Sequence, residues 1–244
     1  MKHNGIKFEK QIVNCYRMRD FNNPHYMPGV IAATRHLIKA FPQGKIVHRS
    51  EISLRGRGLG EIKADLWIEG FGVSVKMKDA VQLSSAEGKG TAKILEKVYQ
   101  VIEPSLDVGQ KGQIQDMIRD IRTMPTVMVS VKNRSKAKQR KPKKFAVASD
   151  YDTWMKHVRP ALNESLRNCW DISEFHIATI EEMLTGRLLF SDGEGVADYI
   201  LTPKYFKYID RAYTRMIADA SSVDVRGKSR GGISSGVVRF DTKI

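Results

Sequence analysis

A carboxylate and a lysine share one face of a β-hairpin that we predict in the middle of the chain. Side chains alternate along a strand, so Asp65, in the predicted strand of residues 61–69, points to the polar face. Lys76 lies on the polar face of the returning strand, residues 73–78, after a turn predicted at Gly70-Phe71-Gly72. An isolated acid beside a lysine is a combination that can support hydrolysis.

Asp65 and Lys76 meet the minimal requirements for metal-assisted hydrolysis of a phosphodiester. A divalent cation neutralises the phosphate and lowers the pKa of a bound water. Mg²⁺, or Mn²⁺ in its place, takes oxygen ligands, typically one or two carboxylates with water and substrate phosphate. A lysine beside them orients the attacking water and balances the charge of the transition state. Glu9 completes the site if the first predicted helix, residues 5–19, packs across the sheet.

Each of these residues also has a purely structural interpretation. Glu9 fits a solvated acid that the helix dipole favours. Asp65 fits a surface ion pair with Lys63 or Lys78, which would contribute little to stability. Lys76 fits an ordinary solvated lysine on a strand. The spacing alone leaves both interpretations open.

The chain is strongly basic. Its 244 residues include 41 Lys and Arg against 27 Asp and Glu, for a formal net charge of +14. Such an excess favours a polyanionic partner, because each neutralised phosphate releases condensed counterions. Residues 132–144 contain eight basic side chains and no acid, and we predict them as a tip between two strands that lies along a phosphate backbone. A solvated and mobile loop is the alternative.

The residues expected to contact nucleic acid share a positive charge and lie in the central hairpin, the basic tip or the C-terminal loop. They are Lys63, Lys78, Lys132, Arg134, Lys136, Lys138, Arg140, Lys141, Lys143, Lys144, Arg226, Lys228 and Arg230.

Composition also sets the expected compartment. Cys15 and Cys169 are too few for a disulfide framework or a structural zinc site. No apolar run approaches the ~20 residues that a membrane span needs, and the N-terminus lacks the apolar core of a signal peptide. We therefore expect no membrane partner and a cytoplasmic location.

Periodicity and turn residues predict an α/β core, residues 1–149, and a mostly helical C-terminal region, residues 150–244, packed on that core. The C-terminal region is predicted to end in a short β-hairpin. Within it, Thr202 and Pro203 have the form of an N-cap and a first-turn proline, which predicts a helix to about Ala220.

The order of these residues resembles the PD-(D/E)xK nuclease superfamily, which includes restriction endonucleases, Holliday-junction resolvases and phage nucleases. The resemblance covers about residues 5–100 and implies a restriction-endonuclease-like central mixed β-sheet flanked by helices. It also implies Mg²⁺-dependent cleavage of DNA in a bacterial or phage-infected cell. The matching features are a Gly5-x-x-Phe8-Glu9 helix, Asp65 on one strand, Ser74-Val75-Lys76 on the next, and the Gln82 segment that follows.

The resemblance assigns a role to each matching residue. Asp65 corresponds to the metal-binding aspartate, Lys76 to the motif lysine, Glu9 to the glutamate of the first helix, and Gln82 to the polar residue often found after the lysine. The chain departs from the pattern at Ser74, where an Asp or Glu is expected.

Glu61 and Glu87 are the candidate replacements for this missing acid. If neither of them reaches the metal, the protein would bind one ion weakly or be inactive.

The leading hypothesis is a Mg²⁺-dependent endonuclease acting on duplex or branched DNA. A homodimer is one option, because cuts on both strands usually need two active sites. The main rival is a non-catalytic nucleic-acid-binding or packaging protein that uses the same basic surface. An RNA-directed factor is the third option, with salt-sensitive RNA binding as its signature.

Overall fold

The structure, a computed structural model, describes residues 4–52, 62–78, 84–124, 153–190, 193–230 and 233–242. The basic segment of residues 132–144, the two strands predicted on either side of it, Glu61 and Gln82 lie outside these ranges. The side chains of Glu87, Lys228 and Arg230 lie outside them as well.

The chain forms two compact units. The first unit contains Met1–Val81, Glu181–Asp219 and Lys243–Ile244, and the second contains Gln82–Ile180 and Ala220–Thr242. This division differs from the linear one expected from the sequence, because a strand from the C-terminal half pairs with the central hairpin.

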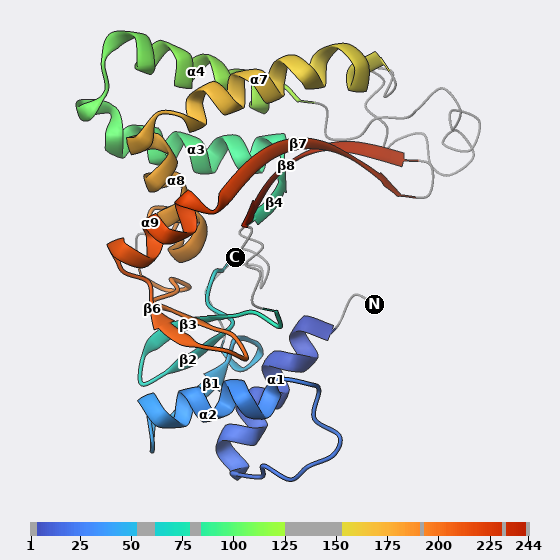
Figure 1. Cartoon of the computed structure of the whole chain (residues 1–244), viewed down its shortest axis with the longest axis vertical. Helices are drawn as coiled ribbons and strands as arrows, with labels where there is room; N and C mark the ends of the chain where they lie inside the picture. Colours follow the sequence, from blue (N-terminus) through green and yellow to red (C-terminus); the bar gives the residue numbers. More distant parts are fainter. Residues whose placement is uncertain are drawn as a thin grey trace. The chain divides into compact units, whose positions relative to one another are not determined.

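The first unit is built on a five-stranded mixed sheet with the order β1-β2-β3-β5-β6 (Figure 1). Neighbouring strands are antiparallel except β3 and β5, which pair in parallel, with Val73 opposite Tyr199. This sheet confirms the mixed α/β class that the sequence predicts. The strands are β1 (Ile46–His48), β2 (Leu66–Ile68), β3 (Phe71–Val75), β5 (Tyr199–Leu201) and β6 (Phe206–Tyr208).

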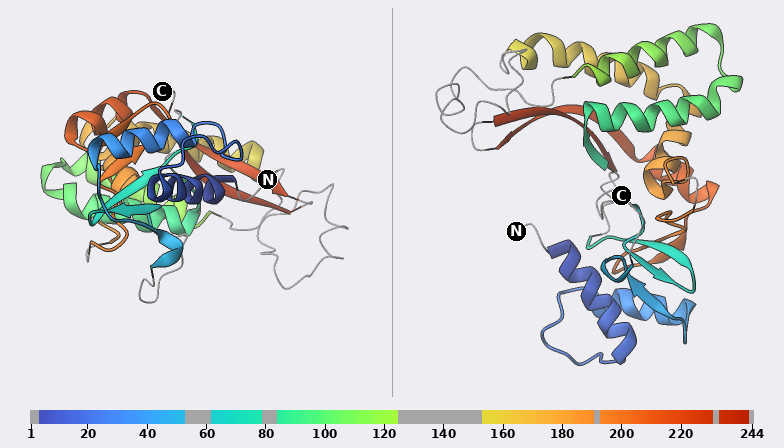
Figure 2. Two further views of the ribbon diagram at one scale, coloured as in Figure 1. Left: turned by 90° about the horizontal axis from the view of Figure 1, so that it is seen from below. Right: turned by 180° about the vertical axis from the view of Figure 1, so that it is seen from behind.

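Two helices, α1 (Asn4–Met18) and α2 (Val30–Ala40), cover one face of this sheet, as both views in Figure 2 show. Each has apolar residues at helical spacing, and that stripe faces the strands. The resulting core includes Phe8 and Ile12 of α1 and Leu66 of β2, all fully buried. The bounds of α1 differ by one residue at each end from the helix predicted at residues 5–19.

The central hairpin turns one residue earlier than predicted. Ile68 pairs with Phe71, so Glu69 and Gly70 make a two-residue turn, with φ of 51° and 85°. Positive φ at both turn positions matches the right-handed twist of the strands. The alternation is unaffected, because Leu66 still pairs with Val73.

Gly72 is therefore a strand residue, and its backbone approaches a neighbouring segment closely. Its N–H donates to Asp198 Oδ2 at 3.0 Å, and its carbonyl accepts from Asp198 N at 2.8 Å. A Cβ at this position would lie 1.9 Å from the carbonyl oxygen of Val196. Only glycine fits without moving the backbone.

Replacement of Gly72 by alanine should destabilise the protein strongly. We expect Gly72→Ala to lower the free energy of unfolding by about 3 kcal/mol, the upper end for overpacking, because the clash is with backbone. Thermal and urea unfolding measure this. Gly112→Ala is the matched control: Gly112 is exposed in a helix with open space around it, and should gain about 0.5 kcal/mol. Equal stability of the two variants would contradict the close approach.

The second unit pairs a three-stranded antiparallel sheet, order β4-β8-β7, with helices (Figure 1). Its strands are β4 (Ser84–Glu87), β7 (Ser221–Arg230) and β8 (Ile233–Thr242). The predicted C-terminal hairpin exists, but its strands are ten residues each rather than short. In Figures 1 and 2 these two long strands curve together.

Helices α3, α4 and α7 pack on one another and on this sheet, around the buried Leu95, Trp154 and Phe240. A capping box, in which Asp107 and Gln110 exchange backbone and side-chain hydrogen bonds, begins α4. The helical elements are α3 (Gly88–Ile102), η2 (Glu103–Ser105), α4 (Val108–Arg122), the π-helical turn η5 (Trp154–Val158), α7 (Arg159–Trp170) and α8 (Ser173–Thr185). The residues of α8 after Ile180 belong to the first unit.

The helix predicted from Thr202 to Ala220 is wrong in its first half. The hydroxyl oxygen of Thr202 does accept hydrogen bonds from Lys204 N and Tyr205 N, but it caps only a turn. The chain then extends into β6, where the ring of Phe206 stacks on Tyr199 of β5 at 4.7 Å. Pairing with the sheet overrides the local helix signal. The helix proper, α9 (Arg211–Asp219), begins only after Asp210.

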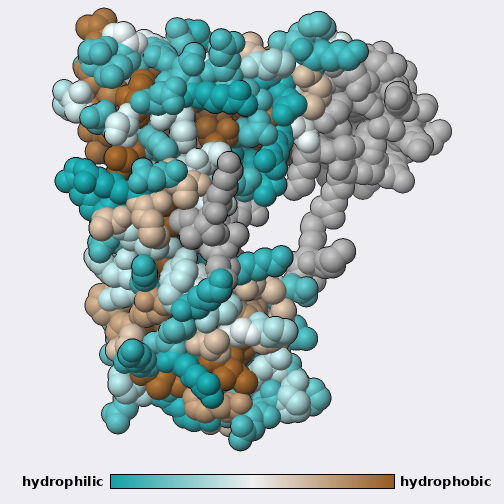
Figure 3. Space-filling model, viewed as in Figure 1, coloured by the Kyte–Doolittle hydropathy of each residue, from teal (hydrophilic) through white to brown (hydrophobic). Residues whose placement is uncertain are grey.

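Hydrophilic side chains cover most of the face shown in Figure 3, and apolar residues appear there in small patches. Among the described residues, no helix has the length and apolar character needed to cross a bilayer.

Candidate active site

Glu9 and Asp65 converge on one positive group. Both side chains are buried, with 6% and 8% of the residue exposed. One guanidinium nitrogen of Arg49 lies 2.9 Å from Asp65 Oδ1, and the other lies 3.1 Å from Glu9 Oε2. Two acids that lie 56 positions apart in the sequence therefore share a single cation.

Asp65, directly before β2, is held by hydrogen bonds with β3 and with Arg49. Its backbone N–H donates to Val73 O at 2.8 Å, and its carbonyl accepts from Arg49 N at 3.1 Å. Its side-chain Oδ2 accepts the N–H of Val75 at 2.8 Å. One carboxylate oxygen is thus fixed by the backbone of β3, which aims the other at Arg49.

Glu9 is positioned by α1 and by a buried histidine. Phe8 and Ile12 anchor the helix in the core on either side of it. His48, at the end of β1, places Nε2 3.3 Å from Glu9 Oε2, while its Nδ1 accepts the backbone N–H of Ser50 at 3.1 Å. Because Nδ1 is an acceptor, Nε2 carries the proton and donates it to Glu9.

Arg49 begins a short 3₁₀ turn, η1 (Arg49–Glu51), directly after β1. Neither Arg49 nor His48 is a candidate in the sequence, because nothing in the segment 45–54 shows that its side chains reach α1. The signal that could have pointed to them is indirect. If Glu9 and Asp65 are both buried, a positively charged side chain must lie near them.

Lys76 lies close enough to Asp65 for its charge to lower the pKa of that carboxyl. Its Nζ donates to the hydroxyl oxygen of Ser74 at 2.8 Å, and its backbone N–H donates to Leu201 O at 2.8 Å. Ser74 is buried on the same face of β3. The serine that stands in place of the expected acid therefore holds the lysine ammonium group.

The surroundings of Asp65 change its pKa in opposing directions. Burial raises the pKa of this carboxyl, and the charge of Lys76 lowers it. Glu9 raises it further, whereas Arg49 and the Val75 N–H lower it, and the net effect is a pKa above the usual value. The nearby positive groups therefore do not fully offset the effects of burial and of Glu9 on this carboxyl.

A second lysine and a third acid lie in the same unit. Burial lowers the pKa of Lys63 to about 8, with a further contribution from the charge of Lys76, while Glu182 and Asp65 oppose the change. Glu182, near the end of α8, is 2% exposed and accepts the N–H groups of Leu188 and Leu189 at 2.7 and 3.0 Å. Burial raises the pKa of Glu182. Sequence reasoning does not single out Glu182.

The lowered pKa of Lys63 predicts a pH-dependent stability. Between about pH 8 and 10.5 the unfolded chain binds this proton and the folded chain does not, so the free energy of unfolding rises with pH. Between about pH 7 and 9.5 the free energy of unfolding should increase in the wild type by about 1 to 2 kcal/mol more than it does in Lys63→Met. Urea unfolding at each pH measures this difference. Lys78→Met, which removes an exposed lysine, should keep the wild-type gain. The same gain in Lys63→Met would assign the effect to another group.

The donor set suits a hard divalent cation, because two carboxylates face a position where the protein already places a positive group. Within the described residues, no group of three or more His, Cys, Asp or Glu side chains is arranged to hold a metal ion. Water and a substrate phosphate would supply the other ligands. Glu87 is the last residue of β4, and the structure describes its backbone but not its side chain. Glu61 and Gln82 are outside the described ranges.

The described basic candidates differ in their availability to phosphate. Lys78 is exposed, whereas Lys63 is half-buried. Arg226 is exposed but paired with acids of its own sheet: its Nε lies 2.9 Å from Asp224 Oδ2 and its Nη2 3.4 Å from Asp241 Oδ2.

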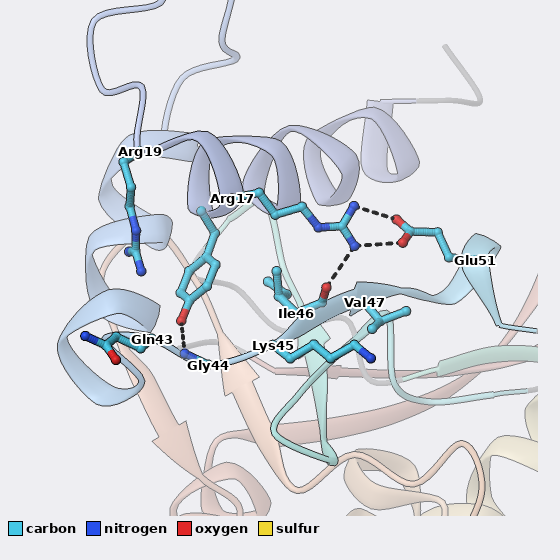
Figure 4. A pocket seen from close by; sticks show the side chains of 9 residues that line it. Arg17, Arg19, Gln43, Gly44, Lys45, Ile46, Val47 and Glu51 are labelled. Atoms are coloured by element: carbon cyan, nitrogen blue, oxygen red, sulfur yellow. Dashed lines mark hydrogen bonds and ion pairs between the residues drawn. The ribbon is translucent and has the colours of Figure 1, made fainter.

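A separate cavity of about 430 Å³ lies between the end of α1 and β1 (Figure 4). Arg17 reaches from α1 to Glu51, with the shorter N–O distance 2.7 Å, and to Ile46 O at 2.8 Å. Arg19 and Lys45 add two positive charges to its lining. No pair of acids converges among its lining residues, so the Glu9–Asp65 site is the candidate for catalysis.

A scan against protein-family models found no match, and neither did a search of the curated proteins. A search of solved structures matched restriction endonuclease MspI in complex with its cognate DNA. That match has 14% sequence identity and a TM-score of 0.43, and it covers 96% of this chain and 88% of that one.

Proposed function

We propose that the protein is a metal-dependent endonuclease that hydrolyses phosphodiester bonds in DNA. The observation that carries this proposal is the buried pair of Glu9 and Asp65, which converge on one cation position beside Lys76. Buried acids are costly unless they are paired, so an acid pair placed next to a lysine is typical of a functional site.

Each residue has a defined task in this proposal. Glu9 and Asp65 would hold Mg²⁺ or Mn²⁺, which when bound neutralises the phosphate and supplies a water of lowered pKa. The ammonium group of Lys76, held by Ser74, orients the attacking water and stabilises the charge that develops on the phosphate. His48 and the Val75 N–H keep the two carboxylates aimed at the same point.

DNA is the proposed substrate because of the charge of the whole chain. The net charge of +14 favours association with a polyanion, and the affinity should fall steeply with salt. The basic segment of residues 132–144 is the proposed backbone-tracking element, and Lys78 is a proposed contact closer to the acids in sequence.

Plasmid cleavage tests the proposal. Supercoiled plasmid incubated with the protein and Mg²⁺ should become nicked or linear, and EDTA should prevent this. DNA binding that persists in EDTA would separate affinity from catalysis. Salt-sensitive binding with no cleavage across Mg²⁺, Mn²⁺ and a range of pH would support the non-catalytic binding protein instead.

A further inference from the structure

Arg49 bridges the two acids that are the candidate metal ligands. Its guanidinium spans Glu9 and Asp65, and its side chain keeps 17% of its surface exposed. We propose that Arg49 is a built-in competitor of the divalent cation: it holds the acid pair together without metal, and metal binding releases it to contact a DNA phosphate. This inference rests on the proposed function.

The charges at the site require such a group. Two buried carboxylates repel each other, and each raises the cost of ionising the other. Burial and Glu9 raise the pKa of Asp65, and Arg49 is one of the groups that lower it. Because a guanidinium is a planar fork, it can serve two carboxylates at once, which a lysine ammonium does less well.

The contacts of the four carboxylate oxygens leave little room for Arg49 and a divalent cation to bind the two acids at the same time. Asp65 Oδ2 is taken by the Val75 N–H, so Oδ1 is the oxygen left for a ligand, and Arg49 is 2.9 Å from it. On Glu9, Arg49 lies 3.1 Å from Oε2 and 3.4 Å from Oε1. A Mg²⁺ ion shared by both acids must approach their oxygens to about 2.1 Å. It would need the positions that the guanidinium now occupies.

The acids are fixed and the arginine side chain can leave. Glu9 is restrained by His48 and by the buried face of α1, and Asp65 by β3. The backbone N–H of Arg49 donates to Asp65 O, and its side chain is held by the ion pairs to the two acids. Displacement therefore means a side-chain rotation at the start of η1. A released guanidinium is well suited to a phosphate, so DNA and metal should each strengthen the binding of the other.

Mn²⁺ binding without DNA tests this inference. Titration followed by calorimetry and by the electron paramagnetic resonance signal of free Mn²⁺ should give weak binding to the wild type. Arg49→Met should bind about tenfold more tightly, because its competitor is gone. Arg17→Met is the charge-matched control: Arg17 pairs with Glu51 and the Ile46 carbonyl rather than with the acid pair, and its loss should change the affinity by less than about twofold.

Wild-type or weaker Mn²⁺ affinity in Arg49→Met would overturn the inference. If the wild type still binds Mn²⁺ and cleaves plasmid, the proposed function survives this result. If no variant binds Mn²⁺ and no cleavage occurs, both fail. The wild type alone provides a second measurement: Mg²⁺ should shift the guanidinium NMR signals of Arg49 and leave those of Arg17 in place, and an unchanged Arg49 signal at saturating Mg²⁺ would also overturn it.

Discussion

Asp65→Asn should lower the rate of DNA cleavage by about a thousandfold or more. Asparagine has nearly the same shape, and its amide oxygen can still accept the N–H of Val75. The substitution removes the negative charge that faces Glu9 and Arg49, and with it one of the two proposed ligands of the cation. Because burial raises the pKa of Asp65, the folded state disfavours its ionised form, so the neutral asparagine should fold well.

Single-turnover cleavage with saturating protein measures this effect, and circular dichroism verifies the fold. Glu51→Gln is the matched control, since Glu51 is an acid two residues after Arg49 that pairs with Arg17 instead. It should cleave within about twofold of the wild type. Cleavage by Asp65→Asn within about tenfold of the wild type would remove Asp65 from the site.

Lys76→Met should lower the cleavage rate by about a hundredfold or more while leaving the affinity for DNA nearly unchanged. Methionine keeps much of the apolar stem of the lysine and loses the ammonium group that Ser74 holds. In the proposed function many basic side chains would share the binding of the phosphate backbone, so the loss of one contact should change affinity little.

The comparison with Lys78→Met separates catalysis from binding. Lys78 is exposed and lies two residues after Lys76. Its loss should slightly weaken the affinity for DNA and the dependence of that affinity on salt. The rate of cleavage at saturating protein should not change. Fluorescence anisotropy at several salt concentrations gives the affinities. If Lys76→Met reduces binding and cleavage in the same proportion, Lys76 is a phosphate contact only.

The parts of the site that could be predicted are those that local geometry determines. Alternation along a strand places Asp65 and Lys76 on one face whatever the rest of the chain does. Helical periodicity likewise predicts the helix of residues 5–19, which α1 matches within one residue at each end. The one-residue error at the turn did not matter, because the register between Leu66 and Val73 is set by the buried face.

The remaining parts depend on contacts that no local pattern encodes. Asp198 holds Gly72 from 126 positions away, and β5 inserts beside β3 from the same distant segment. The pairing of β5 with β3 places this distant segment in the first unit. The pairing of β6 with β5 explains why the chain after Thr202 is a strand where a helix is predicted. Arg49 was missed for the same reason, since its role appears only when α1 and β2 lie on either side of it.

The central claim is that Glu9 and Asp65 hold one cation together, and a double-mutant cycle of Mn²⁺ affinity tests it most directly. Glu9→Gln and Asp65→Asn should each weaken binding by about tenfold or more, and the double variant should be little weaker than either single one. Non-additivity of this kind means that both side chains bind the same ion. Losses that simply add, or wild-type affinity in either single variant, would contradict the shared site.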